Sequence, residues 1–370
     1  MKAVAVFPLQ KKVELVNHPE PGSLAADQVR IRVLEVGICG TDREIATYEY
    51  GLAPKGSEYL VLGHESLGEV LETGRAVARV KPGDLVIPTV RRSCPERCAA
   101  CAAGRQDFCY TGHYRERGIV ADHGFLTETI VEQEANLNLV PCTLRDIAVL
   151  TEPLTVTEKA FDQVAAIQSR LSSIRPRQAV SGQIQRAVVL GAGPVGLLAA
   201  MKFRAEGYEV WVYSRGSEAV KPPIVSEFGG HFIDSESVSP AELGSLCGQI
   251  DVIYEAMGGA DVAFKVLEQL GHNGVFVFTG IPRHSHPVPL NTSSLLYNLV
   301  LKNQVVCGTV NAAPCHFQRA IADLVLFRTL FPDAVRKLIT NRFPIERFNE
   351  PLSTNAGIKN VIAVSTASCQ

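Results

Sequence analysis

Four cysteines lie within sixteen positions of this sequence, at Cys94, Cys98, Cys101 and Cys109. Four thiolates around one Zn²⁺ form a closed tetrahedral site, which can organise a loop that has no hydrophobic core of its own. The spacing therefore predicts a structural zinc site without an open coordination position. The alternative is a group of reduced thiols without metal, which would leave reactive side chains beside one another for no packing gain.

A second set of candidate ligands is dispersed along the chain, at Cys39, His64 and Glu152. One thiolate, one imidazole and one carboxylate would leave a fourth position for water or substrate, as a catalytic zinc site requires. Spacing alone cannot bring these residues together. Taken singly, a buried cysteine, a hydrogen-bonded histidine and a carboxylate at a helix start are the commoner roles.

Residues 191–196 read Gly-Ala-Gly-Pro-Val-Gly, after an apolar strand pattern and before a helical one. In that context Gly191 permits the tight turn, Gly193 lets the backbone approach a pyrophosphate, and Gly196 lets helix and strand pack closely. The helix N-terminus presents its amides to the anion. The pattern predicts a dinucleotide site, with a ligand-free glycine turn as the alternative.

The end of the next strand carries Ser214 and Arg215, where NAD sites usually place Asp or Glu. A hydroxyl and a guanidinium suit a 2′-phosphate, because Arg offers a charge-assisted pair and a carboxylate would repel it. NADP is therefore favoured, with NAD left open as a secondary cofactor. The alternative is that Arg215 is a solvated surface charge.

The elements that must position these residues differ between the two parts of the chain. Up to about residue 150, short strand patterns are bounded by Gly and Pro, which predicts a β-rich, loop-rich part; they cover 29–34, 68–74 and 81–87. From about 155, apolar strand patterns alternate with helix-length segments, which predicts βαβ units and a parallel sheet; they cover 187–190, 209–213, 251–255 and 274–278. The last part predicts a helix over 317–328 and a closing strand over 361–364.

Composition excludes several classes of protein. The 370 residues are 46% hydrophobic, enough for about two domains with cores of their own, and the formal net charge is only −2. Without long basic runs there is no electrostatic reason to expect nucleic acid or an anionic membrane as partner. The uncharged apolar stretch 187–201 is too short to span a bilayer, and no secretory signal is recognisable, so a cytoplasmic protein is expected.

Motifs along nearly the whole chain resemble the zinc-dependent medium-chain dehydrogenases, and more narrowly the archaeal-type glucose (aldose) 1-dehydrogenases. Beside the cysteine cluster and the glycine loop, the motifs that carry this resemblance are Gly-Ile-Cys-Gly-Thr-Asp-Arg at 37–43, Gly-His-Glu at 63–65, Glu-Arg-Gly-Ile at 116–119, Leu-Thr-Glu-Pro-Leu at 150–154, Phe-Thr-Gly-Ile-Pro at 278–282 and Gly-Thr-Val-Asn at 308–311. The four-cysteine loop departs from the family pattern by one extra residue between Cys94 and Cys98.

The resemblance implies an α/β protein with two domains. A GroES-like, β-rich catalytic domain would comprise residues 1–155 and 311–370. A Rossmann domain, with a doubly wound parallel sheet, would comprise 156–310. Family members are usually dimers or tetramers, which implies a homodimer or homotetramer.

The resemblance also assigns site residues. It implies that Cys39 and His64 hold the catalytic zinc, with Glu65 and Glu152 as direct or water-mediated partners that can exchange roles. Thr41 would lie near the reacting hydroxyl, and sugar hydroxyls would contact Thr41, Glu116, Glu152 and Asn311. The implied cofactor contacts beyond the three glycines and residues 214–215 are Pro194, Val195, Thr279, Gly280, Ile281, Val310 and Asn311.

The function expected on these grounds is oxidation of an aldose, glucose or another sugar such as galactose, at C1 to the lactone, with hydride passing to NADP. Zinc would act as a Lewis acid on the C1 hydroxyl. Two alternatives are a zinc-dependent polyol or secondary-alcohol dehydrogenase, and a non-catalytic dinucleotide sensor that keeps the fold. The remaining histidines, including those at 123, 284, 286 and 316, are expected to be structural or surface residues.

Overall fold

The computed structural model describes residues 1–171, 184–216, 220–282, 287–354 and 356–365. Contacts divide the chain into two compact units, which are treated separately below. The first unit comprises 1–155, 311–325 and 339–370, and the second comprises 156–310 and 326–338. Whereas the expected domain boundaries placed 326–338 with the β-rich part, these residues pack in the second unit, where Phe331 contacts Phe228 and Lys337 pairs with Glu227.

The first unit is rich in β-structure. A seven-stranded sheet has the order β11-β6-β5-β3-β19-β18, with β10 paired to β3, and the orders of two three-stranded sheets are β2-β1-β4 and β7-β8-β9. Its strands are β1 Lys2–Phe7, β2 Lys12–Asn17, β3 Gln28–Ile38, β4 Leu60–Val61, β5 Glu65–Thr73, β6 Leu85–Pro88, β7 Arg91–Arg92, β8 Arg115–Arg117, β9 Ala121–Asp122, β10 Thr129–Gln133, β11 Leu137–Val140, β18 Ile339–Pro344 and β19 Lys359–Ala363.

Strand β3 organises this unit, because it pairs with β5, β10 and β19. Alternate residues of its first half are buried, as expected for one face on a core, and its second half is buried throughout. Gly37, near its end, lies opposite Glu65 of β5 and opposite Val361 of β19. Strand pairing thus brings together the end of β3, the start of β5 and the middle of β19, which are far apart in sequence.

The helices of the first unit are short. They are α1 Gly40–Ala46, α2 Ala99–Ala102 and α12 Asn349–Ser353, while α3 Thr151–Gln168 and α10 Pro314–Leu330 begin in this unit and end in the second. Among the described residues, none of the helices combines the length and apolar character needed to cross a bilayer.

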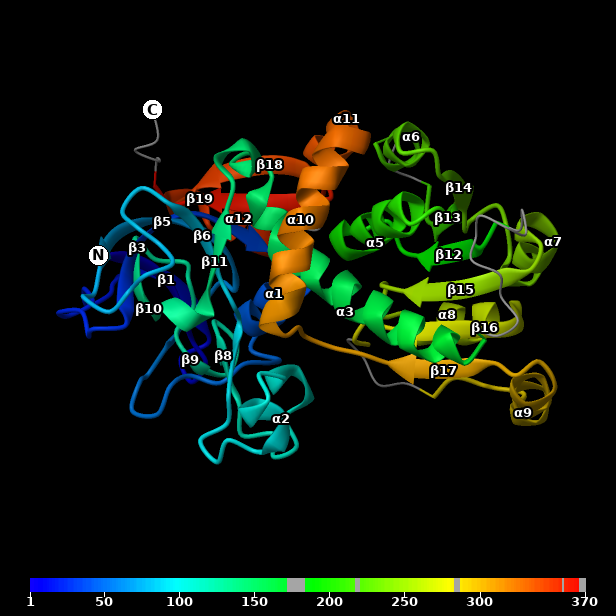
Figure 1. The fold of residues 1–370 in the computed structure, drawn as a ribbon, viewed down its shortest axis with the longest axis horizontal. Coiled ribbons are helices and arrows are strands. Elements are labelled where there is room, and N and C mark those ends of the chain that lie inside the picture. Colours follow the sequence, from blue (N-terminus) through cyan, green and yellow to red (C-terminus); the bar gives the residue numbers. More distant parts are fainter. Residues whose placement is uncertain (172–183, 217–219, 283–286, 355, 366–370) are drawn as a thin grey trace. The chain divides into compact units, whose positions relative to one another are not determined.

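The second unit is a parallel six-stranded sheet in the order β14-β13-β12-β15-β16-β17 (Figure 1). In chain order this is 3-2-1-4-5-6, the doubly wound Rossmann arrangement, with its switch between β12 and β15. The strands are β12 Arg186–Leu190, β13 Glu209–Ser214, β14 His231–Asp234, β15 Ile250–Glu255, β16 Leu270–Phe278 and β17 Val305–Gly308. The helices are α5 Pro194–Ala205, α6 Lys221–Glu227, α7 Leu243–Cys247, α8 Ala260–Leu267, α9 Thr292–Leu301 and α11 Pro332–Lys337.

The architecture expected from the sequence, a β-rich part and a doubly wound parallel sheet, is confirmed. The central strands β12 and β15 are buried along almost their full length, which explains why their sequences are continuous apolar runs rather than alternating ones. The predicted C-terminal helix and closing strand correspond to α10 and β19.

Candidate active site and nucleotide site

Two of the three dispersed candidate ligands, Cys39 and His64, converge in the first unit together with Glu65. One ligand atom from each of Cys39, His64 and Glu65 lies within 4.8 Å of the other two. The Cys39 Sγ is 3.1 Å from the His64 Nε2. A thiolate, an imidazole and a carboxylate at such distances form a donor set that suits Zn²⁺.

Cys39 owes its position to the end of β3 and the start of α1. It is the N-cap of α1: its sulfur accepts the Thr41 amide at 3.3 Å, and the Asp42 carboxylate accepts the Cys39 amide at 3.0 Å. This reciprocal capping box satisfies two amides that the helix itself cannot pair. The backbone therefore fixes the sulfur at the start of the helix.

His64 is oriented from behind by Asp42. The two are fully or almost fully buried, and His64 Nδ1 lies 3.3 Å from Asp42 Oδ1. Burial opposes a charge on His64, but the Cys39 sulfur and the Asp42 carboxylate outweigh it and raise the pKa of His64 well above its usual value. A carboxylate behind one ring nitrogen leaves the other for a cation, which is the arrangement that metal-binding histidines usually have.

Glu65 is held by a buried ion pair. Lys359 of β19 is 1% exposed and donates to both carboxylate oxygens of Glu65, at 2.7 Å for Oε1, and to the Ile38 carbonyl at 3.3 Å. The space for this carboxylate exists because its neighbour on β3 is Gly37: a Cβ there would stand 2.1 Å from Glu65 Oε2. Glu65 therefore already has a cationic partner within the protein.

Glu152 lies in the first turn of α3 and outside the three-atom cluster. It is close enough to interact electrostatically with His64 and Glu65, and burial is the main cause that raises the pKa of Glu152 to about 7. The positive charges of His64 and Lys359 oppose this rise in pKa without overcoming it. A divalent cation beside it would favour its ionised form.

The four-cysteine loop also converges. The sulfurs of Cys94, Cys98, Cys101 and Cys109 all lie within 4.8 Å of one another, and all four are free thiols. Burial raises the pKa of Cys101 to about 12, whereas hydrogen bonds to Thr111 outweigh burial and lower the pKa of Cys109 to about 6. Four sulfurs without a disulfide fit a closed tetrahedral zinc.

The predicted sugar contacts have one clear meeting point in this unit. Asn311 Nδ2 donates to Glu116 Oε1 at 2.7 Å, although 195 positions separate them. The backbone of Asn311 is left-handed, with φ 59°, and its Oδ1 accepts the next amide. Thr41 is partly buried in the first turn of α1, beside the Cys39 sulfur.

The glycine loop of the second unit has the geometry expected of a dinucleotide turn. Gly191 has φ +102°, and a Cβ on Gly196 would stand 2.0 Å from the Gly191 carbonyl. A Cβ on Gly193 would meet no described atom within 4 Å, so the backbone there borders open space. Pro194 begins α5, and Val195 follows in its first turn. The anion-binding N-terminus of α5 therefore lies at the switch of strand order.

Ser214 and Arg215 follow at the end of β13. Ser214 is 9% exposed, whereas Arg215 is exposed. The next amide, of Gly216, donates to Asp234 Oδ1 at 2.9 Å, and this bond fixes the turn. Arg215 is therefore available to a ligand at the carboxyl edge of the sheet.

The remaining candidate cofactor residues follow β16 and β17. Glu255, 1% exposed at the end of β15, accepts the amides of Met257, Gly258 and Gly280, and its carbonyl accepts the Thr279 amide and hydroxyl. Large apolar side chains are left exposed at this carboxyl edge: Met257 at 38%, Ile281 at 68% and Val310 at 48%. An exposed apolar group beside a dinucleotide turn offers a surface for a nicotinamide ring.

The other histidines behave differently from His64. His123 Nδ1 accepts the Val61 amide at 3.1 Å, and its ring stacks on Tyr59. His316 is fully buried and accepts the Ala313 amide at 2.9 Å. These contacts serve structure, whereas His284 and His286 lie outside the described residues.

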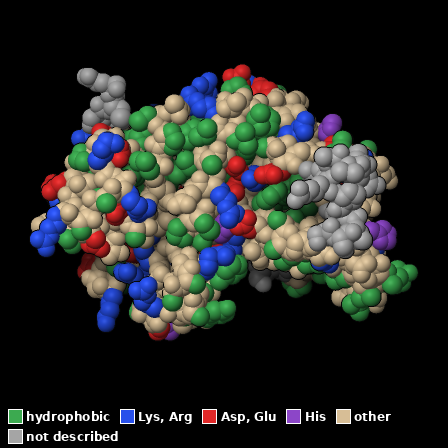
Figure 2. Space-filling model, viewed as in Figure 1, with side chains coloured by type: hydrophobic (Ala, Val, Ile, Leu, Met, Phe, Trp, Pro, Cys, Tyr) green, Lys and Arg blue, Asp and Glu red, His purple; other side chains and the backbone are tan. Residues whose placement is uncertain are grey.

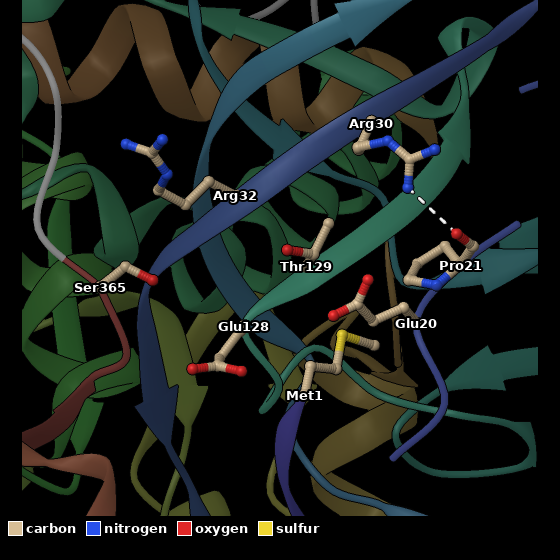
Figure 3. A pocket seen from close by; sticks show the side chains of 8 residues that line it. All are labelled: Met1, Glu20, Pro21, Arg30, Arg32, Glu128, Thr129 and Ser365. Carbon is tan, nitrogen blue, oxygen red and sulfur yellow. Dashed lines mark hydrogen bonds between the residues drawn. The ribbon is translucent and has the colours of Figure 1, made fainter. Parts of the chain in front are cut away.

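A cavity of about 510 Å³ lies elsewhere in the first unit (Figure 3). Its basic side chains are paired within the protein, Arg30 with Glu72 and with the carbonyls of residues 21 and 22, and Arg32 with Glu69. Glu128, on its wall, accepts the Lys2 amide. None of the candidate site residues lines this cavity, so it is not assigned to the reaction.

Sequence reasoning missed the residues that support the ligands. They are Asp42 behind His64, Lys359 on Glu65, Arg91 on Glu116, and Glu255 under the cofactor loops. A signal existed only for Asp42, which stands three positions after Cys39 as a capping box requires. Arg91 and Lys359 lie 25 and 294 positions from their partners on other strands, and Glu255 joins loops up to 25 positions away.

A β-rich unit with this ligand cluster and a Rossmann unit in one chain define the class of zinc-dependent medium-chain dehydrogenases. The alcohol dehydrogenase GroES-like domain matches residues 25–142, and the glucose dehydrogenase C-terminus matches residues 145–364. The chain belongs to the glucose dehydrogenase family.

Relatives share nearly its full length. The glucose 1-dehydrogenase of Thermoproteus tenax is 41% identical over 370 residues, which cover 99% of this chain and 100% of that protein. The glucose 1-dehydrogenase of Methanocella arvoryzae is 39% identical and covers 95% of this chain and 96% of its own. The structure of Haloferax mediterranei glucose dehydrogenase in complex with NADP, Zn and gluconolactone superimposes with a TM-score of 0.87 at 28% identity, covering 99% of this chain and 100% of that one.

Proposed function

We propose that this chain is an NADP-linked, zinc-dependent glucose 1-dehydrogenase, which oxidises glucose at C1 to the lactone. The observation that carries this proposal is the convergence of Cys39, His64 and Glu65 in a chain that matches glucose 1-dehydrogenases along its full length. The gluconolactone bound to the Haloferax relative is the product that such a reaction would yield.

Cys39 and His64 would hold the catalytic zinc, with a carboxylate as third ligand. Both oxygens of Glu65 are engaged by Lys359, whereas Glu152 lies outside that ion pair and burial raises its pKa. These contacts favour Glu152 as the carboxylate that approaches the metal and Glu65 as the one that supports it. Zinc bound there supplies a Lewis acid that makes the C1 hydroxyl easier to deprotonate.

The chain's own residues orient the substrate and move its proton. Glu116, fixed by Asn311, can accept a hydrogen bond from a sugar hydroxyl and so hold C1 in a reactive orientation. Thr41, whose amide donates to the Cys39 sulfur, would receive the hydroxyl proton and pass it toward solvent. The four-cysteine loop would hold a second, structural zinc.

In the second unit, the α5 N-terminus would bind the pyrophosphate, and Ser214 with Arg215 would bind the 2′-phosphate. The loops anchored on Glu255 would hold the nicotinamide, with Thr279, Gly280, Ile281, Val310 and Asn311 as its neighbours. NADP is preferred because no carboxylate follows β13 to accept the ribose 2′-hydroxyl of NAD.

The direct test follows NADP⁺ reduction by absorbance across a panel of aldoses, polyols and simple alcohols, with and without a chelator. Glucose or a close aldose should support reduction, NADP⁺ should outperform NAD⁺, and chelation should abolish turnover. Reduction with polyols or simple alcohols but with no aldose would overturn the proposal. An Arg215→Ala variant should lose preference for NADP⁺ by about tenfold, because one charge-assisted contact is removed.

Self-association is part of the same proposal, and the surface that supports it lies on the second unit. Strand β17 has a paired neighbour, β16, on one side only among the described strands. Helix α9, which precedes it, has no buried residue, and four apolar residues of α9 are each more than half exposed: Leu296, Tyr297, Val300 and Leu301. Figure 2 shows hydrophobic side chains gathered over this edge, at the lower right.

A second copy of the chain fits this surface, because two β17 edges related by a twofold axis can pair and α9 can cover α9. Light scattering should therefore give at least twice the mass of one chain. A Leu301→Glu variant should shift the mass toward the monomer, whereas Leu246→Glu, at an exposed position of α7, should not. An unchanged mass in Leu301→Glu would contradict this surface.

A further inference from the structure

The buried ion pair between Arg91 and Glu116 engages only one of the two carboxylate oxygens of Glu116. Both residues are less than 7% exposed, and strands β7 and β8 place them directly opposite each other. Arg91 Nε donates to Glu116 Oε1 at 2.9 Å, and Nη2 lies 2.9 Å from the same oxygen. Two nitrogens on one oxygen differ from the usual fork, in which each nitrogen faces its own oxygen.

Other contacts reinforce this geometry. The Tyr114 ring lies against the guanidinium of Arg91, with 3.7 Å from Arg91 Cζ to the ring centroid. Asn311 Nδ2 donates to Glu116 Oε1 as well, at 2.7 Å. The stacked ring limits movement of the guanidinium plane, and the amide occupies the remaining side of the oxygen. Oε1 therefore has its full set of donors from within the protein.

The second oxygen is left for something else. No described residue donates a hydrogen bond to Glu116 Oε2. Oε2 is also not one of the solvent-inaccessible side-chain atoms that lack a hydrogen-bond partner, so a ligand can reach it. An ionised oxygen in a largely buried position gains most from one strong donor. Burial raises the pKa of the Tyr50 hydroxyl, and the nearby charge of Glu116 raises it further. Aromatic groups therefore border Glu116.

We propose that Arg91, held by Tyr114, is a positioning residue that makes Glu116 a one-oxygen acceptor, so that Oε2 reads a single hydroxyl of the sugar. This rests on the proposed function, which places the sugar at Glu116. A sugar without that hydroxyl leaves Oε2 unpaired, and sites of this kind reject such analogues strongly. Selectivity would then be set by the guanidinium as much as by the carboxylate.

The test compares wild type with Arg91→Met, Arg91→Lys and Tyr114→Leu on glucose and on each monodeoxyglucose that keeps the C1 hydroxyl. In wild type, one deoxy sugar should lose about 10- to 100-fold in kcat/KM relative to the others, the effect of one charge-assisted hydrogen bond. Arg91→Met should lose a similar factor on glucose, mainly through KM, and no further activity on that deoxy sugar. Arg91→Lys should be intermediate, since an ammonium is not a planar donor.

Controls separate this role from folding and from the proposed function. Arg115→Met removes an exposed arginine next to Glu116, whose distance to Asp122 is 3.9 Å, and should leave the sugar profile unchanged. The KM for NADP⁺ and the zinc content should stay within twofold of wild type in all variants. If Arg91→Met does not fold, Arg91→Lys and Tyr114→Leu carry the same comparison.

Two results would overturn the inference while leaving the dehydrogenase intact. One is an equal loss on every sugar in Arg91→Lys and Tyr114→Leu, which would mark a purely structural role. The other is a wild-type profile in which no single deoxy sugar stands out. Failure of wild type to oxidise any aldose would instead overturn the proposed function.

Discussion

The two clusters of candidate metal ligands in the first unit are held in opposite ways. The four thiols at 94–109 come from one short loop whose regular structure is limited to the four-residue α2 and a three-residue 3-10 helix, Gln106–Phe108. Cys39, His64 and Glu65 come from the ends of β3 and β5, and buried Asp42 and Lys359 support them. In the first cluster the metal would order the chain, whereas in the second the chain orders the ligands before any metal binds.

This difference assigns different consequences to metal loss. A site with its supports already in place can release its ion and keep its shape, so the effect falls on chemistry. A loop without a core depends on its ion for order, so the effect falls on structure.

The largest effect is expected from Cys39→Ala. Loss of the thiolate should lower NADP⁺ reduction with glucose at least about 1000-fold, because several kcal/mol of Lewis-acid stabilisation are lost. Binding of NADPH and the melting temperature should change little. Cys142→Ala, at an exposed cysteine outside both clusters, is the matched control and should stay active. Full activity in the Cys39 variant would remove the catalytic assignment.

Lys359→Met tests whether the chain itself holds the catalytic cluster. Removing one partner of a buried ion pair leaves the charge of Glu65 uncompensated, which typically costs about 3–5 kcal/mol of stability. Urea unfolding should report this loss, and the double variant with Glu65→Gln should recover most of it. Lys337→Met, which removes a half-exposed partner of Glu227, should cost less than about 1 kcal/mol. Equal effects of both lysines would contradict the comparison.

The sequence predicted the local cluster better than the dispersed one. Spacing alone indicated Cys94, Cys98, Cys101 and Cys109, and apolar runs indicated the parallel sheet. Cys39 and His64 needed a family resemblance, because nothing in their spacing encodes the pairing of β3 with β5. Lys359 could not be predicted at all, since 294 positions separate it from Glu65 and only the pairing of β19 with β3 brings it close.

The pairing of Arg91 with Glu116 escaped for a related reason. The strands β7 and β8 have two and three residues, too short for an alternating pattern to be read, and the cysteine loop separates them. A charged residue next to another, as in Arg91-Arg92, reads as a solvated surface segment. Buried polar networks of this kind depend on tertiary packing, which a sequence pattern does not report.

Cys101→Ser addresses the other side of the comparison. Its sulfur is almost fully buried, and its loss should lower the zinc content by one ion per chain and make the 94–109 loop a site of proteolysis. Glucose oxidation should fall by no more than about tenfold, because the second cluster keeps its own supports. Complete loss of activity with a full zinc content would show that the two clusters are not independent.

The smallest effect is expected from His18 and His123, which are not candidate metal ligands. Their titration must be known before a loss of zinc in acid can be attributed to the ligands. Burial is the main cause of a lowered pKa at both His18 and His123, and it takes the pKa of His123 to about 4. The positive charge of Arg117 lowers both pKa values further. An unfolded histidine titrates near 6.5, so between about pH 4 and 6.5 the unfolded chain binds a proton that the folded chain does not. The free energy of unfolding therefore rises with pH across this window and falls as the solution is acidified.

Acid then destabilises the fold through His123 even where zinc stays bound. A His123→Asn variant removes the titration while its side-chain oxygen can still accept the Val61 amide, so its melting temperature should depend less steeply on pH between 6.5 and 4. Zinc that leaves this variant over the same interval must leave through protonation of the ligands themselves. If the pH dependence of melting matches wild type, His123 does not control acid stability, and His18 or loss of metal would account for it.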